Sequence, residues 1–210
     1  MIEKICDMLM KRIRKKMPEV DDERAEVIKY GLEIIIGEIP KMILLVAISL
    51  IFGIFKYTMI ALIVVFPYRY FAGGIHLKTH LGCILGTSAF YFGNVFISKL
   101  LNNYNINTEP ILLIIGIMFS IIMISLYAPA DTENIPILRK KDRLKKKICS
   151  YISVVGIAVV SIIAKDKVVS NICVIGMIFQ SLAISKIAYD FFKIKLGYLE
   201  YIKEKNSAIQ

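Results

Sequence analysis

Long apolar stretches separated by short polar segments run along most of the chain. A helix needs about 20 mainly apolar residues to cross the hydrocarbon core of a bilayer. Six stretches approach that length, at about 31–54, 56–72, 81–100, 110–128, 147–164 and 168–190. The pattern predicts an all-α, polytopic integral membrane protein with about six transmembrane helices.

The first two stretches are less regular than the others. Glu38 and Lys41 interrupt the first stretch, and residues three apart on a helix can pair across one turn, so we expect these two to pair in a structural role. The second stretch is predicted to cross the membrane as far as Phe66. The Tyr-Arg-Tyr sequence at 68–70 that follows is typical of an interfacial belt.

The N-terminal segment 1–28 mixes apolar and basic residues. Apolar residues recur at helical spacing with lysine and arginine between them: Ile2, Ile5, Leu9 and Ile13. This spacing predicts an amphipathic helix that lies in the membrane surface, and a helix that packs over the cytoplasmic loops is the alternative. Because we see no repeat and no separate soluble domain, residues 1–210 are predicted to form one membrane-embedded domain.

Composition and charge also indicate an integral membrane protein. The chain is 57% hydrophobic with a formal net charge of +10, and its mean hydropathy is +0.64. The basic residues concentrate at 11–16 and 139–147, beside apolar stretches and without interleaved aromatic residues. We therefore expect the charge to serve contact with membrane lipid and not nucleic-acid binding.

The distribution of lysine and arginine also predicts the orientation. Basic loops stay on the cytoplasmic side, so the N-terminus and segment 139–147 should lie inside, whereas the uncharged loop 102–107 should lie outside. With six spans, both termini of this multi-pass protein are then cytoplasmic. The connection 73–79 lies at the cytoplasmic face of the cell membrane.

The segment 68–83 contains the side chains most suited to catalysis. It contains both histidines of the chain, His76 and His80, and one of four scattered cysteines, Cys83. A thiol nucleophile needs a neighbouring base, and histidine titrates in the right range. His80 precedes Cys83 by three residues, but His76, seven residues away, can reach it only if the helix is broken between them, so spacing leaves both open.

Two other interpretations of these residues remain. A cysteine in a membrane helix is often a packing residue, and His76, His80 and Cys83 could also bind a metal. No glutamate follows His76 as in the HExxH pattern of zinc peptidases, so we expect neither a metal nor another cofactor.

Arg69, Gly73-Gly74, His76 and Cys83, in a chain with these spans, resemble the accessory gene regulator B (AgrB) family of membrane peptidases that process quorum-sensing propeptides. The sequence Ala-Pro-Ala-Asp-Thr-Glu-Asn at 128–134 is similar to the family's proline- and acid-containing loop. The resemblance covers essentially the whole chain.

The resemblance implies a thiol endopeptidase with His76 as base and Cys83 as nucleophile, and assigns His80 no role. Arg69 and Gly74 match positions that the family needs for activity. The enzyme would cleave the C-terminal part of an AgrD-like autoinducing-peptide precursor through an acyl-enzyme thioester and promote its cyclisation to a thiolactone or lactone.

Further residues have expected roles around this site. Asp131 could orient His76 if its loop folds against the site, although a binding or structural role is equally expected. The basic cluster Arg139, Lys140 and Lys141 suits the acidic tail of the propeptide or lipid headgroups. The resemblance also implies a homodimer.

Two other functions compete with the peptidase. A small transporter or exporter of a peptide or ion would line a polar path with His76, Arg69, Glu38 and Lys41. It would tolerate loss of the Cys83 thiol. A membrane scaffold or sensor would tolerate replacement of both His76 and Cys83. Inverted hydropathy symmetry is absent, which disfavours transport.

Overall fold

All labelled elements of the structure are helices. The structure, a computed structural model, describes residues 2–75, 77, 79–104, 109–132, 137–198 and 202. Within them, one isolated β-bridge accompanies the eight labelled helices. The prediction of an all-α membrane protein is confirmed. The chain divides into two compact units, residues 1–52 and 53–210, which are described separately.

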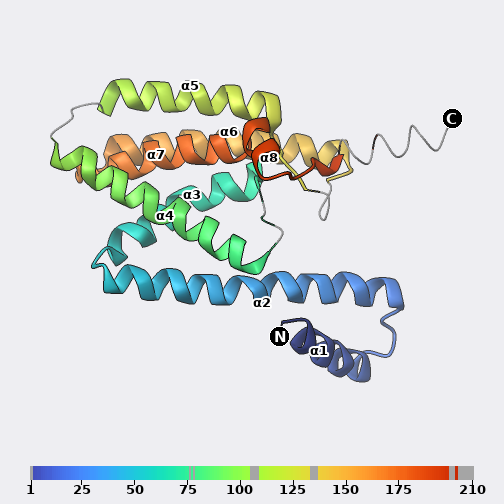
Figure 1. Ribbon diagram of the computed structural model, residues 1–210. Coiled ribbons are helices and arrows are strands. Elements are labelled where there is room, and N and C mark those ends of the chain that lie inside the picture. Colours follow the sequence, from blue (N-terminus) through green and yellow to red (C-terminus); the bar gives the residue numbers. More distant parts are fainter. Residues whose placement is uncertain are drawn as a thin grey trace. The chain divides into compact units, whose positions relative to one another are not determined.

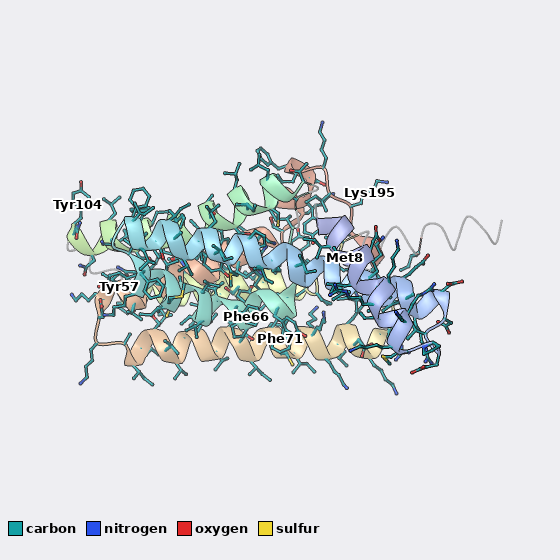
Figure 2. All side chains as sticks on the ribbon, turned by 90° about the horizontal axis from the view of Figure 1, so that it is seen from below. Met8, Tyr57, Phe66, Phe71, Tyr104 and Lys195 are labelled. Carbon is teal, nitrogen blue, oxygen red and sulfur yellow. The ribbon has the colours of Figure 1, made fainter. Side chains whose placement is uncertain are left out.

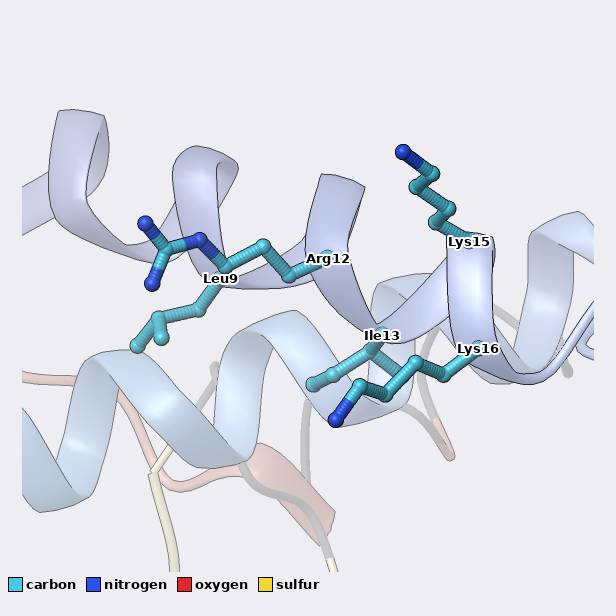
Figure 3. Close-up of a pocket in the computed structure, with 5 residues that line it drawn as sticks. All are labelled: Leu9, Arg12, Ile13, Lys15 and Lys16. Atoms are coloured by element: carbon cyan, nitrogen blue, oxygen red, sulfur yellow. The ribbon is translucent and has the colours of Figure 1, made fainter.

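The first unit is a pair of helices, α1 (Ile2–Lys16) and α2 (Asp22–Ile51). Two ion pairs join the helices: Arg14 of α1 pairs with Asp22, and Lys29 of α2 pairs with Asp7 of α1 at 2.6 Å. Leu9 points toward α2 in Figure 3, so α1 packs an apolar face on its neighbour. Whether the opposite face lies on lipid stays a prediction.

α2 begins at Asp22, where the Asp21 side chain caps the helix by accepting the Arg24 N–H at 2.8 Å, so this helix starts about nine residues before the predicted span. The predicted pairing of Glu38 with Lys41 on this helix is confirmed.

The second unit is a helix bundle (Figure 1). Its helices are α3 (Phe55–Ala72), α4 (His80–Asn103), α5 (Glu109–Tyr127), α6 (Lys140–Ile163), α7 (Lys167–Ala183) and α8 (Lys186–Phe191). Every predicted apolar stretch overlaps a helix of the structure. Within the described ranges, three helices, α4, α5 and α6, are long and apolar enough to cross a membrane, and α7 is a shorter apolar helix.

α7 is the centre of this bundle, where it contacts α3, α4, α5, α6 and α8. Side chains are buried on all its sides, as expected for a core helix. A Cβ added to Gly176 would lie 2.5 Å from Val65 Cγ2 of α3. The absence of a side chain at Gly176 therefore allows α3 and α7 to approach closely.

Polar side chains join α7 to its neighbours inside the apolar bundle. Asn171 Nδ2 donates to the Ser98 carbonyl at 3.2 Å, and Asn94 Nδ2 donates to the Ile172 carbonyl at 3.2 Å. These side chains are buried. In lipid an unpaired polar group is costly, so the pairs fix the register of α4 against α7.

Apolar side chains cover the outside of the helices, where Phe66 and Phe71 of α3 are labelled in Figure 2. Exposed residues recur three or four apart on α5, at Ile111, Ile114, Ile115, Met118, Ile121, Ile122 and Leu126. A continuous exposed apolar stripe is unfavourable in water and favourable in a bilayer. These stripes are the surface expected to face lipid.

Three details differ from the predictions. Tyr68 is not part of an interfacial belt: its ring is fully buried and its hydroxyl bonds Ser181 at 2.9 Å, whereas Tyr70 is exposed. The last predicted span is two helices, because Ser185 caps a new helix, α8. The basic segment 140–147 is the start of α6 and not a loop.

Replacement of Gly176 by alanine should destabilise the bundle by about 1–3 kcal/mol, because the new methyl group meets the stiff, buried Val65 side chain. Gly156→Ala is the matched control, since a Cβ there meets nothing within 4 Å. It should stay within about 1 kcal/mol of wild type. Thermal unfolding in detergent measures both, and equal Tm values for the two variants would contradict this packing.

Candidate functional site

Cys83 lies on the first turn of α4 and is half-buried. The helix begins there because the Thr79 side chain accepts the Gly82 N–H at 3.0 Å, and the Thr79 carbonyl accepts the Cys83 N–H at 2.9 Å.

Both histidines adjoin this turn in the sequence. His80 is the first residue of α4, but its side chain and the whole of His76 lie outside the described residues. α3 ends at Ala72 and α4 begins at His80. The separation of about 10.5 Å expected for His76 and Cys83 on one continuous helix therefore does not apply.

Gly73 and Gly74 turn the chain out of α3. Their φ angles are 77° and 137°, which residues with a Cβ rarely adopt. Gly73 forms a parallel bridge with Ala130: the Ala130 N–H donates to the Ala72 carbonyl at 2.8 Å, and the Gly74 N–H donates to the Ala130 carbonyl at 3.0 Å. The loop after α5 thus folds directly against the Gly-Gly segment.

The chain next contacts the end of α7. The Ile75 N–H donates to the Ala183 carbonyl at 3.2 Å. A Cβ on Gly74 would lie 3.4 Å from the same carbonyl oxygen, so little room exists for a side chain. The path of the backbone up to the residue before His76 is therefore fixed from two sides.

Gln180 of α7 and Arg69 of α3 hold this segment from the interior. The Gln180 Nε2 donates to the Gly73 carbonyl at 2.7 Å, and its Oε1 accepts from the Arg69 guanidinium at 3.3 Å. The second guanidinium nitrogen donates to the Ile75 carbonyl at 3.3 Å. Arg69 also lies over the Phe90 ring of α4, 5.6 Å from its centroid. The structure thus gives Arg69 a positioning role for this segment.

Asp131, in the loop after α5, is anchored to α6. One carboxylate oxygen accepts from Arg143 at 3.0 Å and from the Ile137 N–H at 2.9 Å. Arg143 also donates to the Pro129 carbonyl at 3.2 Å. The other Asp131 oxygen is buried and has no hydrogen-bond partner among the described residues. These contacts support a structural role, and orientation of His76 stays a prediction.

Tyr189 of α8, which follows α7, contacts the same loop. Its hydroxyl donates to the Asp131 carbonyl at 3.2 Å.

The predicted basic cluster begins α6 and is exposed. Arg139 is the N-cap residue, and Lys140 and Lys141 form the first turn with Asp142. Cations at a helix N-terminus are unfavourable because they meet the positive end of the helix dipole. Their concentration there leaves a positive surface suited to an anionic partner.

Neither Gln180 nor Arg143 is predicted from the sequence to be part of this site. A lone amide in an apolar stretch has no spacing signature, although a polar side chain in a span is itself a signal of an interhelical hydrogen bond. Arg143 lies in a basic run in which no local feature distinguishes it. Within the described residues, no three His, Cys, Asp or Glu side chains are grouped as in a metal site.

Comparison with known proteins assigns the family. The sequence profile described as "Accessory gene regulator B" matches residues 2–184. The chain belongs to the AgrB family. No solved structure matches it.

AgrB relatives align along nearly the whole chain. An AgrB-like protein of Listeria welshimeri is 29% identical over 205 residues, which cover 96% of this chain and 94% of the relative. The accessory gene regulator protein B of Staphylococcus haemolyticus is 26% identical over 167 residues, which cover 77% of this chain and 82% of the relative. AgrB membership implies a peptidase that processes an AgrD propeptide in quorum sensing.

Gly73→Ala should reduce propeptide processing at least tenfold and lower the Tm, because the new Cβ would lie 2.2 Å from the Ala130 carbonyl oxygen. Gly53→Ala is the control: Gly53 also has positive φ, at 64°, but a Cβ there meets nothing within 4 Å. Its free energy of unfolding should fall by only about 1–2 kcal/mol, because alanine is strained at this φ angle. Propeptide processing and Tm are measured on both variants. Equal losses in the two variants would contradict the bridge between Gly73 and Ala130.

Proposed function

We propose that the protein is a membrane cysteine endopeptidase in which His76 and Cys83 cleave an AgrD-like propeptide. The site lies at the cytoplasmic membrane face, with both termini cytoplasmic. Family membership supports the reaction, and the sequence motif supports the two residues. No cofactor is required by this chemistry.

The observation that carries this proposal is the contact of Leu77 with the start of α4. A Cβ on Gly86 would lie 3.1 Å from Leu77 Cδ1, and a Cβ on Gly82 would lie 3.5 Å from Leu77 Cβ. Leu77 thus packs on the two turns that carry Cys83. Leu77 follows His76 directly in the sequence, so the residue next to the candidate base lies against the turns that carry the candidate nucleophile.

The reaction proceeds in two acyl transfers. His76 takes the Cys83 proton, and the sulfur attacks a backbone carbonyl of the propeptide. The C–N bond breaks, the proton passes from His76 to the leaving amine, and the C-terminal fragment departs. A thiol of the bound peptide then attacks the thioester, forms the thiolactone and releases Cys83. A serine hydroxyl would give a lactone.

The second step needs a peptide held in place and little water. Exchange of one thioester for another is nearly balanced in energy, so hydrolysis must be slow for the ring to form. A site at the boundary of the apolar bundle suits this requirement. Arg69 acts in this proposal through the backbone that it holds at Ile75.

Replacement of Cys83 by serine or of His76 by alanine should abolish propeptide cleavage, whereas His80→Ala should retain it. The assay uses membranes that carry each full-length variant with the cognate propeptide, with and without chelator, and chromatography confirms that each variant is folded. Cleavage that survives in Cys83→Ser would restore the transporter interpretation. Loss with chelator would restore the metal interpretation.

The surface formed by Arg139, Lys140 and Lys141 is proposed to hold the acidic tail of the propeptide. Reversal of all three to glutamate should raise the KM for cleavage roughly tenfold or more with little change in kcat, because exposed ion pairs contribute about 0.2–1 kcal/mol each. Higher salt should weaken the wild type similarly.

The control reverses three other exposed cations near the end of α7, Lys186, Lys193 and Lys195. This variant has the same net charge and should keep the wild-type KM. An equal rise of KM in both variants would mean that overall charge, and not the start of α6, attracts the substrate.

A further inference from the structure

An apolar groove runs along the outside of the bundle between α3 and α6. It encloses about 540 Å³, within the range of roughly 300–1,000 Å³ typical of small-molecule sites. Residues that line it include Pro67 and Phe71 of α3 and Cys149, Ile152, Gly156 and Val160 of α6. Its lining carries no charged side chain, and it lies on a helix long and apolar enough to span a membrane.

Gly156 makes the groove open. A Cβ added there would meet no atom within 4 Å, in contrast to Gly176 in the core of the bundle. The groove is therefore open at the outer surface of α6 beside Gly156. In a bilayer it must be filled by apolar matter.

Two lysines lie beyond one end of the groove. Lys145 and Lys146 precede Cys149 by about one helical turn, so they extend the same face of α6. The Lys146 ammonium lies over the Tyr70 ring of α3, 5.8 Å from its centroid, and so reaches across to the other wall. Tyr70 itself is exposed and stacks on Phe66.

Two cations of α6 that flank Lys145 and Lys146 in the sequence bond other groups of the protein. Arg143 pairs with Asp131, and Lys147 donates to the Ser125 carbonyl at 2.7 Å. In the described part of the chain, neither Lys145 nor Lys146 has an ion pair. An apolar groove that ends at two unneutralised lysines and an aromatic ring matches an anionic lipid.

We propose that the groove between α3 and α6 binds one anionic phospholipid, with an acyl chain along Gly156 and the phosphate on Lys145 and Lys146. Basic pockets between membrane helices recognise lipid headgroups by this combination of charge and apolar contact. A second copy of the chain fits the same groove poorly. A symmetric contact would bring the lysines of both copies together, and like charges repel.

The experiment compares lipid retention by the full-length protein reconstituted in vesicles of equal phosphatidylglycerol and phosphatidylcholine with identical acyl chains. After mild detergent extraction, native mass spectrometry counts each bound lipid. Wild type should retain one phosphatidylglycerol in preference to phosphatidylcholine by roughly tenfold or more, since each lysine near the lipid surface favours the anion.

Two variants remove the two parts of the site. Lys145→Gln with Lys146→Gln should abolish the preference for phosphatidylglycerol. Gly156→Leu fills the groove without a clash and should reduce retention of either lipid. The matched controls are Lys186→Gln with Lys193→Gln, which removes the same charge elsewhere, and Val155→Leu, at an exposed position on α6 outside the groove lining. Both controls should retain lipid as wild type does.

Unchanged retention in both site variants, or equal loss in the controls, would overturn the proposal. A second measurement uses wild type alone, so it does not depend on the folding of any variant. A photoactivatable phosphatidylglycerol should label the α6 peptide around Ile152 and Gly156. Labelling spread evenly over the exposed stripe of α5, or a Cys149–Cys149 crosslink between copies, would contradict a lipid in this groove.

Discussion

The amide of Gln180 connects the parts of the protein on which the candidate site depends. It donates to the Gly73 carbonyl and accepts from Arg69, and both partners are more than a hundred residues away in the sequence. The Gln180 side chain is fully buried, so loss of a partner leaves unpaired polar atoms on its amide at a high energetic cost. The segment before His76 is consequently held from the core helix α7.

α7 is shorter than a typical membrane span and is buried on all sides, and its side chains hold several neighbouring elements. It provides Gly176 for close contact with α3, Asn171 for the register with α4, and Gln180 with Ala183 for the Gly-Gly segment. The outer helices can then present apolar stripes to lipid without contributing to the site. Helices position functional groups more precisely than loops do. Here the Gly73-Gly74 segment is a loop, and its contacts with helix α7 fix its position.

Much of the fold could be predicted from the sequence because a bilayer imposes a simple length and composition on each helix. Local spacing also predicted the Glu38–Lys41 pair. Local spacing did not predict contacts between residues that are distant in the sequence. Tyr68 lies among residues typical of an interface, and only the position of Ser181 shows that its ring is in the core. Residue types and spacing could not choose between His76 and His80, and the family motif was needed for that choice.

In the proposed reaction Cys83 carries the acyl group of the propeptide. The intact mass of the protein tests this step after incubation with a propeptide whose ring-forming cysteine is replaced by alanine, so that the second transfer cannot occur. We expect an added mass equal to the N-terminal fragment, mapped to Cys83 and released by hydroxylamine. Cleavage of a propeptide without any adduct on Cys83, or an adduct on another residue, would contradict it.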